Sequence, residues 1–359
     1  MKNFWIGLLF ALILIFNYQL TPSILEDTQH ISAIGYDHAG DHRVKATAAV
    51  PFYPAGENVN PINVSYTVEG HTSKSVRQLF QTEAQKEIEA GRINSVVINR
   101  KLAKEGILHI VDSFSRDPFI GRDVHLAIIK DTSEEILKYK YPNAVLSSRY
   151  LDDLLDQGLQ DIIPKTNLHS FLSQYDGMGQ DPFLPLLDLR EEHIHFEGLA
   201  LFKNDQYVDS ISYKESYLFK LLYEKSREGL YNIRMDDGSY LTIENVRTKV
   251  KYNVHGTKKQ PKVEIRLSLL GEIKDASGKS LHQKERMKKV EEQWRKETKK
   301  NAEKLVQKFQ ELKIDPLGIG EKVRSRQRQF RMAEWESLYP TVPISISVKV
   351  RTIDTGIVE

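Results

Sequence analysis

The sequence predicts an α+β protein made of successive mixed domains, each a β-sheet packed with helices, behind an N-terminal apolar anchor. Three observations lead to this prediction. Short segments alternate apolar and polar residues with period two, segments of helical period lie between them, and the one long apolar run is confined to the first twenty residues. A length of 359 residues suggests about two or three domains.

Composition excludes several classes of protein. The chain has 51 Lys+Arg against 49 Asp+Glu, a net charge of +2, which argues against a protein built mainly to coat nucleic acid. A content of 40% hydrophobic and 28% charged residues excludes collagen-like, wholly disordered and multi-span membrane chains. The absence of cysteine removes disulfides, cysteine nucleophiles, thiolate metal sites and thioether or thioester lipid anchors, but it does not fix the redox compartment.

The first twenty residues form a membrane anchor or an export signal. Lys2 precedes an apolar run, residues 4–16, that would make about 20 Å of helix, and with Tyr18 and Leu20 it reaches the lower limit for a spanning helix. Because no small residues stand where a signal would be cleaved, we favour an uncleaved anchor over a cleaved signal or a buried first helix. The basic start places the body of the chain outside the membrane. The anchor residues are Phe4, Trp5, Ile6, Leu8, Leu9, Phe10, Leu12, Ile13, Leu14, Ile15 and Phe16.

An N-terminal α/β domain is expected at residues 21–135. Alternating or continuous apolar runs predict its strands at 31–34, 43–50, 62–68, 93–98 and 124–129, the first two as a hairpin. Ser73 is expected to cap a helix that carries Val76, Leu79, Phe80 and Ile88 on one face. A second helix covers 102–114, and a third follows a cap at 131–135.

The rest of the chain divides into a helical middle region with a linker, residues 136–190, and a C-terminal α+β domain, residues 191–359. Glycine and proline predict the linker at 177–185. Strands are expected at 195–202, 207–211, 239–246, 248–254, 262–270 and 342–350. The clearest helix is amphipathic and covers residues 281–312.

No motif in the sequence predicts catalysis. His193 and His195 would share one face of a strand, but a third zinc ligand is not marked, so an exposed strand face is favoured over an exported zinc enzyme. Asp152-Asp153 has the pattern of a wet helix face, and Asp236-Asp237 that of a turn. Gly318-Ile-Gly320 follows a helix and lacks the lysine of a phosphate loop. We therefore expect no enzyme activity, no cofactor and no metal.

The segment Lys322–Arg331 carries five positive charges in ten residues. A solvated surface is the favoured interpretation. Anionic lipid, a protein partner and nucleic acid remain as alternatives, and an N-terminal anchor would bring basic residues near lipid headgroups.

Five segments in order resemble the Ger(x)C family, the C subunits of bacterial spore germinant receptors. They are Ile31-Ser-Ala-Ile-Gly-Tyr-Asp37, Leu102-Ala-Lys-Glu-Gly-Ile107, Phe114-Ser-Arg-Asp-Pro118 with Arg122, Gly198-Leu-Ala-Leu-Phe-Lys203 with Asp205, and Lys313-Ile-Asp-Pro-Leu-Gly-Ile-Gly320. Each motif is weak alone, but five in this order behind an apolar N-terminus are specific.

The resemblance implies an accessory, non-enzymatic subunit on the outer face of the spore inner membrane. Its partners would be the membrane-spanning A and B subunits of the receptor, with the nutrient bound by those partners. Candidate partner contacts among the matching and basic segments are Arg116, Asp117, Asp315, Gly318, Gly320, Arg324, Arg326 and Arg328, although for Arg116 and Asp117 a loop salt bridge is favoured.

One departure from the family concerns the anchor. Family members carry a lipidated cysteine followed by Trp-Asp after the apolar run, whereas this chain has Leu20-Thr-Pro-Ser-Ile-Leu-Glu-Asp27. Lipidation there is chemically impossible, so either the apolar helix is retained as the anchor or the chain is a divergent or soluble paralogue.

Overall fold

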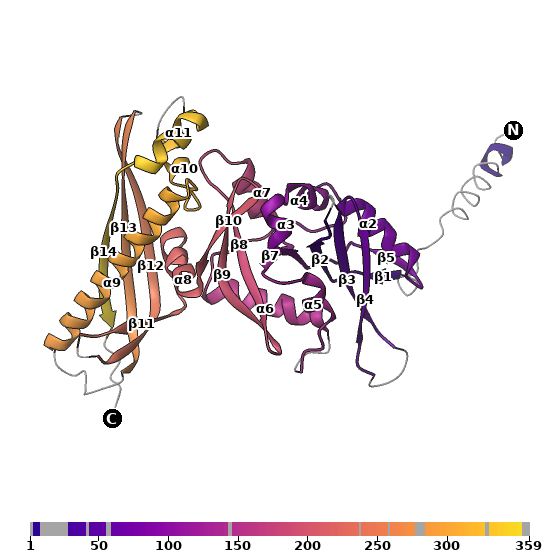
Figure 1. Cartoon of the computed structure of the whole chain (residues 1–359), viewed down its shortest axis with the longest axis horizontal. Helices are drawn as coiled ribbons and strands as arrows, with labels where there is room; N and C mark the ends of the chain where they lie inside the picture. The colour runs from indigo at the N-terminus through magenta and orange to yellow at the C-terminus, as the bar shows by residue number, and fades with distance from the viewer. Residues whose placement is uncertain are drawn as a thin grey trace.

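The computed structural model shows an elongated molecule with two β-sheets along its longest axis (Figure 1). It describes residues 3–7, 28–40, 43–54, 59–142, 146–236, 238–257, 259–276, 284–326 and 330–353. The N-terminal sheet and the C-terminal sheet lie at opposite ends, with helix α8 (Tyr213–Tyr223) between them (Figure 1).

The N-terminal sheet is mixed and has eight strands. Its order is β10 (Gln206–Ser212), β9 (His193–Lys203), β8 (Phe183–Arg190), β7 (His125–Ile129), β6 (Ser95–Asn99), β2 (Ala33–His38), β3 (Val44–Phe52) and β4 (Ile62–Gly70). The neighbours from β2 through β6 and β7 to β8 are parallel, and antiparallel hairpins extend both edges. A short parallel pair, β1 (Thr28–His30) and β5 (Glu87–Glu89), lies beside it.

Helices cover both faces of this sheet because its central strands are apolar on both sides. On one face lie α2 (Ser73–Leu79), α3 (Arg100–Glu105), α4 (Leu108–Ser115) and α7 (Leu168–Asp176). A short 3₁₀ helix, η2 (Phe80–Thr82), continues directly from α2. On the other lie α5 (Ser133–Lys138) and α6 (Ser147–Asp161).

The C-terminal sheet has the order β11 (Leu230–Arg234), β12 (Tyr240–Thr257), β13 (Gln260–Ala276) and β14 (Ile344–Ile353). Its inner face packs against α8, the long α9 (Lys284–Glu311), α10 (Ile319–Arg324) and α11 (Met332–Leu338), which η3 (Tyr339–Thr341) follows. Alternation along the strands turns Ile265, Leu267 and Val348 inward and leaves polar residues outward.

The predicted α+β class and helix–sheet packing are confirmed, and several element predictions are wrong. Residues 102–114 form two helices, because Gly106 adopts φ +112°. The strands expected at 239–246 and 248–254 are one strand, β12, with an irregular register near Asn245. The helix expected from Ser73 is capped by Thr72 and ends at Leu79, so Ile88 lies in β5 instead.

The linker expected at 177–185 overlaps the first residues of the buried strand β8. The glycines and prolines of this segment had indicated a loop instead of a strand. The predicted boundary at residue 190 falls between β8 and β9, which are hydrogen-bonded neighbours. The sequence also did not indicate α8, because its buried residues surround the helix instead of forming one stripe.

Lys220 on α8 connects the two ends of the molecule. It is 2% exposed, and its Nζ donates hydrogen bonds to the carbonyl oxygens of Leu159 (2.8 Å), Gln160 and Ile163 (3.0 Å) at the end of α6. The carbonyls of Leu159 and Gln160 belong to the last turn of α6, where no partner follows within the helix, and the ammonium suits the negative end of the helix dipole. Burial lowers the pKa of Lys220, although Glu224 opposes the change.

Replacing Lys220 by Met should lower the free energy of unfolding by about 2–4 kcal/mol, because buried carbonyl groups lose their donor. The control is Lys214→Met on the same helix, because Lys214 is exposed. Urea denaturation followed by circular dichroism measures both variants. Equal midpoints for the two would contradict the capping role.

Candidate functional site

The segments that carry the family resemblance meet other parts of the chain inside the molecule. Four acidic side chains from these segments, or bonded to them, hold backbone N–H groups or arginines of distant elements. They are Asp37, Asp117, Asp181 and Asp205. In each case a carboxylate accepts hydrogen bonds from a part of the chain that is distant in sequence.

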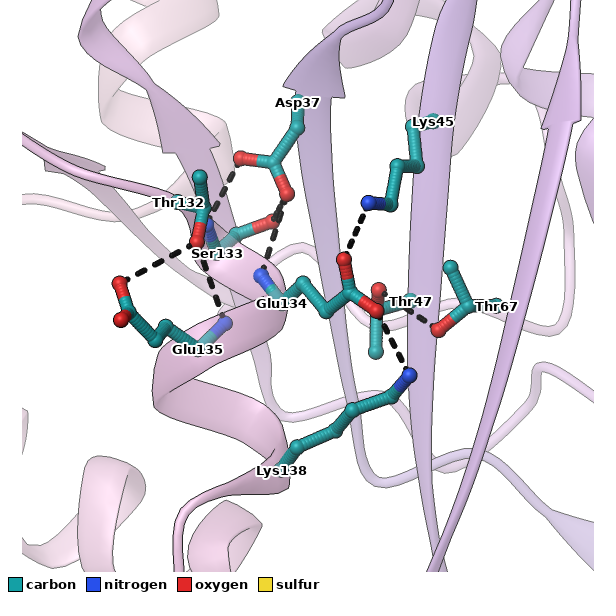
Figure 2. A network of polar contacts seen from close by, with 9 residues as sticks. All are labelled: Asp37, Lys45, Thr47, Thr67, Thr132, Ser133, Glu134, Glu135 and Lys138. Atoms are coloured by element: carbon teal, nitrogen blue, oxygen red, sulfur yellow. Dashed lines mark hydrogen bonds and ion pairs between the residues drawn. The ribbon is translucent and has the colours of Figure 1, made fainter.

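Asp37 caps helix α5 from the end of strand β2 (Figure 2). Its Oδ1 accepts from the Ser133 backbone N–H (2.7 Å), and its Oδ2 accepts from the Ser133 hydroxyl (2.9 Å) and the Glu134 N–H (3.1 Å). Gly35 makes this approach possible, since a Cβ there would lie 2.3 Å from Ser133 Oγ. Burial raises the pKa of Asp37, and the hydrogen bonds from Ser133 and Glu134 oppose the rise.

A second layer of charges supports the cap. Glu134 forms ion pairs with Lys45 of β3 and with Lys138 (2.6 Å), while Thr132 Oγ1 accepts from the Glu135 N–H (3.3 Å), as Figure 2 shows. Burial would raise the pKa of Glu134, but Lys138 and Lys45 lower it overall. The Gly-x-Asp motif is thus a strand-to-helix connection.

Asp205 performs the same task for α4. The turn between β9 and β10 brings its Oδ2 to the Leu108 N–H (3.0 Å), and its carbonyl accepts from the Ile107 N–H (3.1 Å). A Cβ at Gly106 would lie 2.6 Å from that carboxylate. Two motifs almost 100 residues apart therefore form one contact.

Asp117 and Arg116 have different surroundings. Asp117 accepts a hydrogen bond from Arg77 (3.0 Å), whose guanidinium lies over the ring of Phe114, 5.2 Å from its centroid. Arg116 is largely exposed and pairs with Asp112 one helical turn away (2.7 Å). Of this predicted contact pair, Arg116 reaches solvent, whereas Asp117 is partly buried in a salt bridge.

A further connection joins the segment just before β8 to the turn after α9. Asp181 Oδ2 accepts from the Asp315 N–H (2.7 Å), and the Asp181 N–H donates back to the Asp315 carbonyl (3.0 Å). The Asp315 carboxylate accepts from the N–H groups of Ile319 (2.9 Å) and Gly320 (2.6 Å). We call this set, with Gly179, the carboxylate joint.

Close backbone approach completes the joint. Gly179 has φ +88° and a Cβ there would lie 2.5 Å from the carbonyl carbon of Gly320, so only glycine fits. Lys203 forms ion pairs with Asp181 (3.4 Å) and with Glu336 (2.9 Å). Burial raises the pKa of Asp315 to about 7, and it also raises the pKa of Asp181, which Lys203 opposes.

These positions change the interpretation of the predicted contact residues. Asp315, Gly318 and Gly320 are buried and engaged within the chain, which does not match our expectation that they touch a partner. Arg324 and Arg326 are exposed, and Arg328 lies outside the described residues.

Only part of the predicted anchor is described. Residues 3–7 are helical, with Phe4, Trp5 and Ile6 exposed, and the remaining anchor residues from Leu8 to Phe16 lie outside the described residues. Within the described ranges, no helix combines the length and the apolar content needed to cross a membrane.

Groups suited to chemistry are scattered. His193 and His195 lie exposed on one side of β9, and the described part of the chain contains no cluster of three or more His, Cys, Asp or Glu side chains that could hold a metal. Asp153 forms an ion pair with Arg149 on the solvent-exposed face of its helix, as expected. Asp152 instead is half-buried and accepts from Ser95 Oγ (3.2 Å).

Asp152 lines a cavity of about 720 Å³ at the amino ends of β6 and β7. His125 lies there with its Nε2 3.1 Å from Asp156 and 3.7 Å from Asp152. Neither His125 nor Asp181 is marked by the sequence, because a single residue at or before the start of a strand has no spacing pattern.

Replacing Asp37 by Ala should lower the free energy of unfolding by about 2 kcal/mol or more, because three donors lose a buried acceptor. Thr132→Ala, which frees one exposed donor of the same helix, should cost about 1 kcal/mol. Chemical denaturation compares the two variants. A larger loss for Thr132→Ala would show that Asp37 is not the main cap.

The carboxylate joint should make stability depend on pH. Because burial raises the pKa of Asp315 from 3.8 to about 7, the folded state keeps a proton that the unfolded chain has released between those values. The free energy of unfolding should therefore fall as pH rises through this interval, by roughly 4 kcal/mol at most.

The variant Asp315→Asn carries no proton to lose and should flatten this decline. The exposed Asp153→Asn is the matched control and should retain the wild-type slope. Denaturation series between pH 4 and pH 8 measure all three proteins. Identical slopes for wild type and Asp315→Asn would refute the assignment.

Comparison with known proteins identifies the family. Residues 22–189 match the family described as Spore germination protein N-terminal domain, and residues 197–356 match Spore germination B3/GerAC like, C-terminal. Spore germination protein GerQC of Bacillus cereus is 29% identical over 94% of each chain. Putative spore germination protein YfkR of Bacillus subtilis (strain 168) is 18% identical over 81% of this chain and 78% of the relative.

The fold also has a solved counterpart. The crystal structure of the GerBC protein aligns with a TM-score of 0.62 over 89% of this chain and 97% of the other, at 14% identity. That likeness concerns the fold alone, while the sequence matches extend along nearly the whole chain. The chain therefore belongs to the Ger(x)C family of spore germination proteins, the C subunits of germinant receptors.

Proposed function

We propose that this chain is the accessory, non-enzymatic C subunit of a nutrient germinant receptor, displayed on the outer face of the spore inner membrane. Its partners are the membrane-spanning A and B subunits, which bind the nutrient. The observation that supports the proposal is that the acidic residues of the family motifs form hydrogen bonds within the chain. Asp37, Asp205 and Asp315 all hold backbone groups inside the molecule, as a scaffold requires and a catalytic site does not.

The N-terminal segment supports the membrane location. Its apolar run begins behind Lys2, and without cysteine the chain has no lipidation at that position. In Figure 1 the first strand, β1, lies beside the N-terminal sheet, at the far end of the molecule from α9 and α10. Anchored in this way, the N-terminal sheet lies nearer the membrane and the C-terminal sheet projects away from it.

A second candidate is an exported protein that binds anionic lipid or nucleic acid through residues 322–331. The exposed Arg324 and Arg326 favour it. Helix α10, which ends at Arg324 two residues before Arg326, lies at the end of the molecule away from β1, which does not suit lipid binding next to an N-terminal anchor (Figure 1). Retention on DNA or anionic vesicles at low salt, lost when both arginines are neutralised, would favour this alternative.

Deleting the gene should abolish the germination response to one nutrient and leave the responses to others intact, because each receptor recognises its own nutrient. Complementation with the intact chain is the control. Optical-density loss of spore suspensions measures germination. Unchanged responses to every nutrient tested would contradict the receptor role.

The retained anchor has a separate test. The full-length protein should stay with spore membranes in high salt and be released by detergent, because an inserted apolar helix, and not electrostatic attraction, holds it in the membrane. Intact mass of the extracted protein shows whether Met1 and the segment after it remain. Recovery in the soluble fraction would argue against this location.

A further inference from the structure

The outer face of the C-terminal sheet carries a cationic pattern that the proposed function does not use. The register of the strands defines it. Arg247 of β12 lies opposite Leu270 of β13, which lies beside Arg351 of β14. In the next row, Lys249 lies opposite Ser268, and Ser268 lies beside Lys349.

Side chains of one row point to the same face. The third row has Lys251, Arg266 and Ser347. The intervening residues Thr248, Leu269 and Val348 are buried against the helices, so the residues of these rows point outward.

In the first two rows, two basic ridges therefore flank a lower floor of Leu270 and Ser268, and in the third row Arg266 of β13 stands at the end of that floor. One ridge follows β12 through Arg247, Lys249 and Lys251, and the other follows β14 through Lys349 and Arg351, all five exposed. Since adjacent strands are about 4.8 Å apart, the ridges lie roughly 10 Å from each other. The short Ser268 forms the middle of the floor on β13, and we call this feature the basic trough.

The five ridge cations have no ion-pair partner within 4.0 Å among the described residues. Other cations on the same face do. Arg266 pairs with Glu264 (2.8 Å), and Lys274 pairs with Glu244 (2.8 Å) and Glu272 (2.7 Å). Like charges that face each other across β13 without counter-ions repel one another, so the uncompensated ridges favour an anionic partner.

The shape of the trough selects the form of that partner. An extended chain lies in a space one strand wide, and its successive side chains point to alternate sides. Carboxylates on such a chain would reach the ridges of both β12 and β14. A flat lipid surface would contact the ridge ends and leave Ser268 uncovered.

We propose that the basic trough binds an extended acidic segment of a partner protein, lying along β13 between the ridges. This deepens the proposed subunit role by naming the chemistry of one partner contact, and its cellular meaning rests on that role. Binding of the peptide in solution does not depend on the subunit role. A failed binding test therefore counts against the basic trough, and a failed germination test counts against the subunit role.

The probe is a fluorescent eight-residue peptide that alternates Glu and Ser, with a Gln-Ser peptide as its neutral control. The full-length protein in mild detergent should bind the acidic peptide at low salt and lose affinity as salt rises. Replacing Lys249, Lys349 and Arg351 by Gln should weaken binding about tenfold, as three surface ion pairs predict. The matched control replaces Lys322, Arg324 and Arg326 by Gln, which removes the same charge elsewhere and should leave binding unchanged.

A second measurement does not depend on the folding of the triple variant. Because the chain has no cysteine, Ser268→Cys offers a single labelling position on the trough floor. The acidic peptide should shield a fluorophore at that position from a soluble quencher, whereas phosphatidylglycerol vesicles should not.

Three outcomes overturn the proposal. The first is no binding of the acidic peptide at low salt, and the second is equal weakening by both triple variants. The third is binding of phosphatidylglycerol vesicles that shields the floor label when the peptide does not, which would assign the surface to lipid.

Discussion

The carboxylate joint between Asp181 and Asp315 is the constraint on which the arrangement of the two sheets depends. It connects the start of β8, an inner strand of the N-terminal sheet, with the turn that ends α9, the main helix of the C-terminal sheet. Buried carboxylates are costly unless donors surround them, and here backbone N–H groups supply those donors. Separation of the sheets would break the two hydrogen bonds between Asp181 and Asp315 and leave their partners unpaired, so the joint resists rotation of one sheet against the other.

Lys220 forms a second contact between the two sheets, with a cation in place of the carboxylates. It belongs to α8, between the sheets, and caps the carbonyl end of α6 on the N-terminal sheet. One connection thus pairs acids with N–H groups and the other pairs an ammonium with carbonyls. Both use buried charge for geometry, which limits the ways the two sheets can pack.

This distribution of buried charge suits a receptor subunit that acts by contact. The acidic residues of the family motifs are turned inward, whereas the uncompensated cations of β12 and β14 face outward. A rigid body with separate surfaces can hold partners at set positions without chemistry of its own. The strands of the basic trough, β12 to β14, and the first strand of the body, β1, lie at different ends of the molecule (Figure 1).

The sequence by itself determined the class of the fold, the long amphipathic helix α9 and most strands of the outer hairpins. These features follow from periodicity, which is local, and the ordered motifs likewise led to the family. The sequence did not reveal β8, most of whose first half was assigned to a linker, or α8, because burial from several sides erases the alternation that marks an element.

Only the tertiary structure decided what the motif residues do. Asp315 and Gly320 were expected at a partner surface because they belong to a segment that resembles the family, but the distant segment 179–181 packs against them. The basic trough also emerged only from strand register, since Lys249 and Lys349 are 100 residues apart in the sequence and separated by one strand in the sheet. Contacts between distant segments depend on how the chain packs, and local periodicity carries no information about that packing.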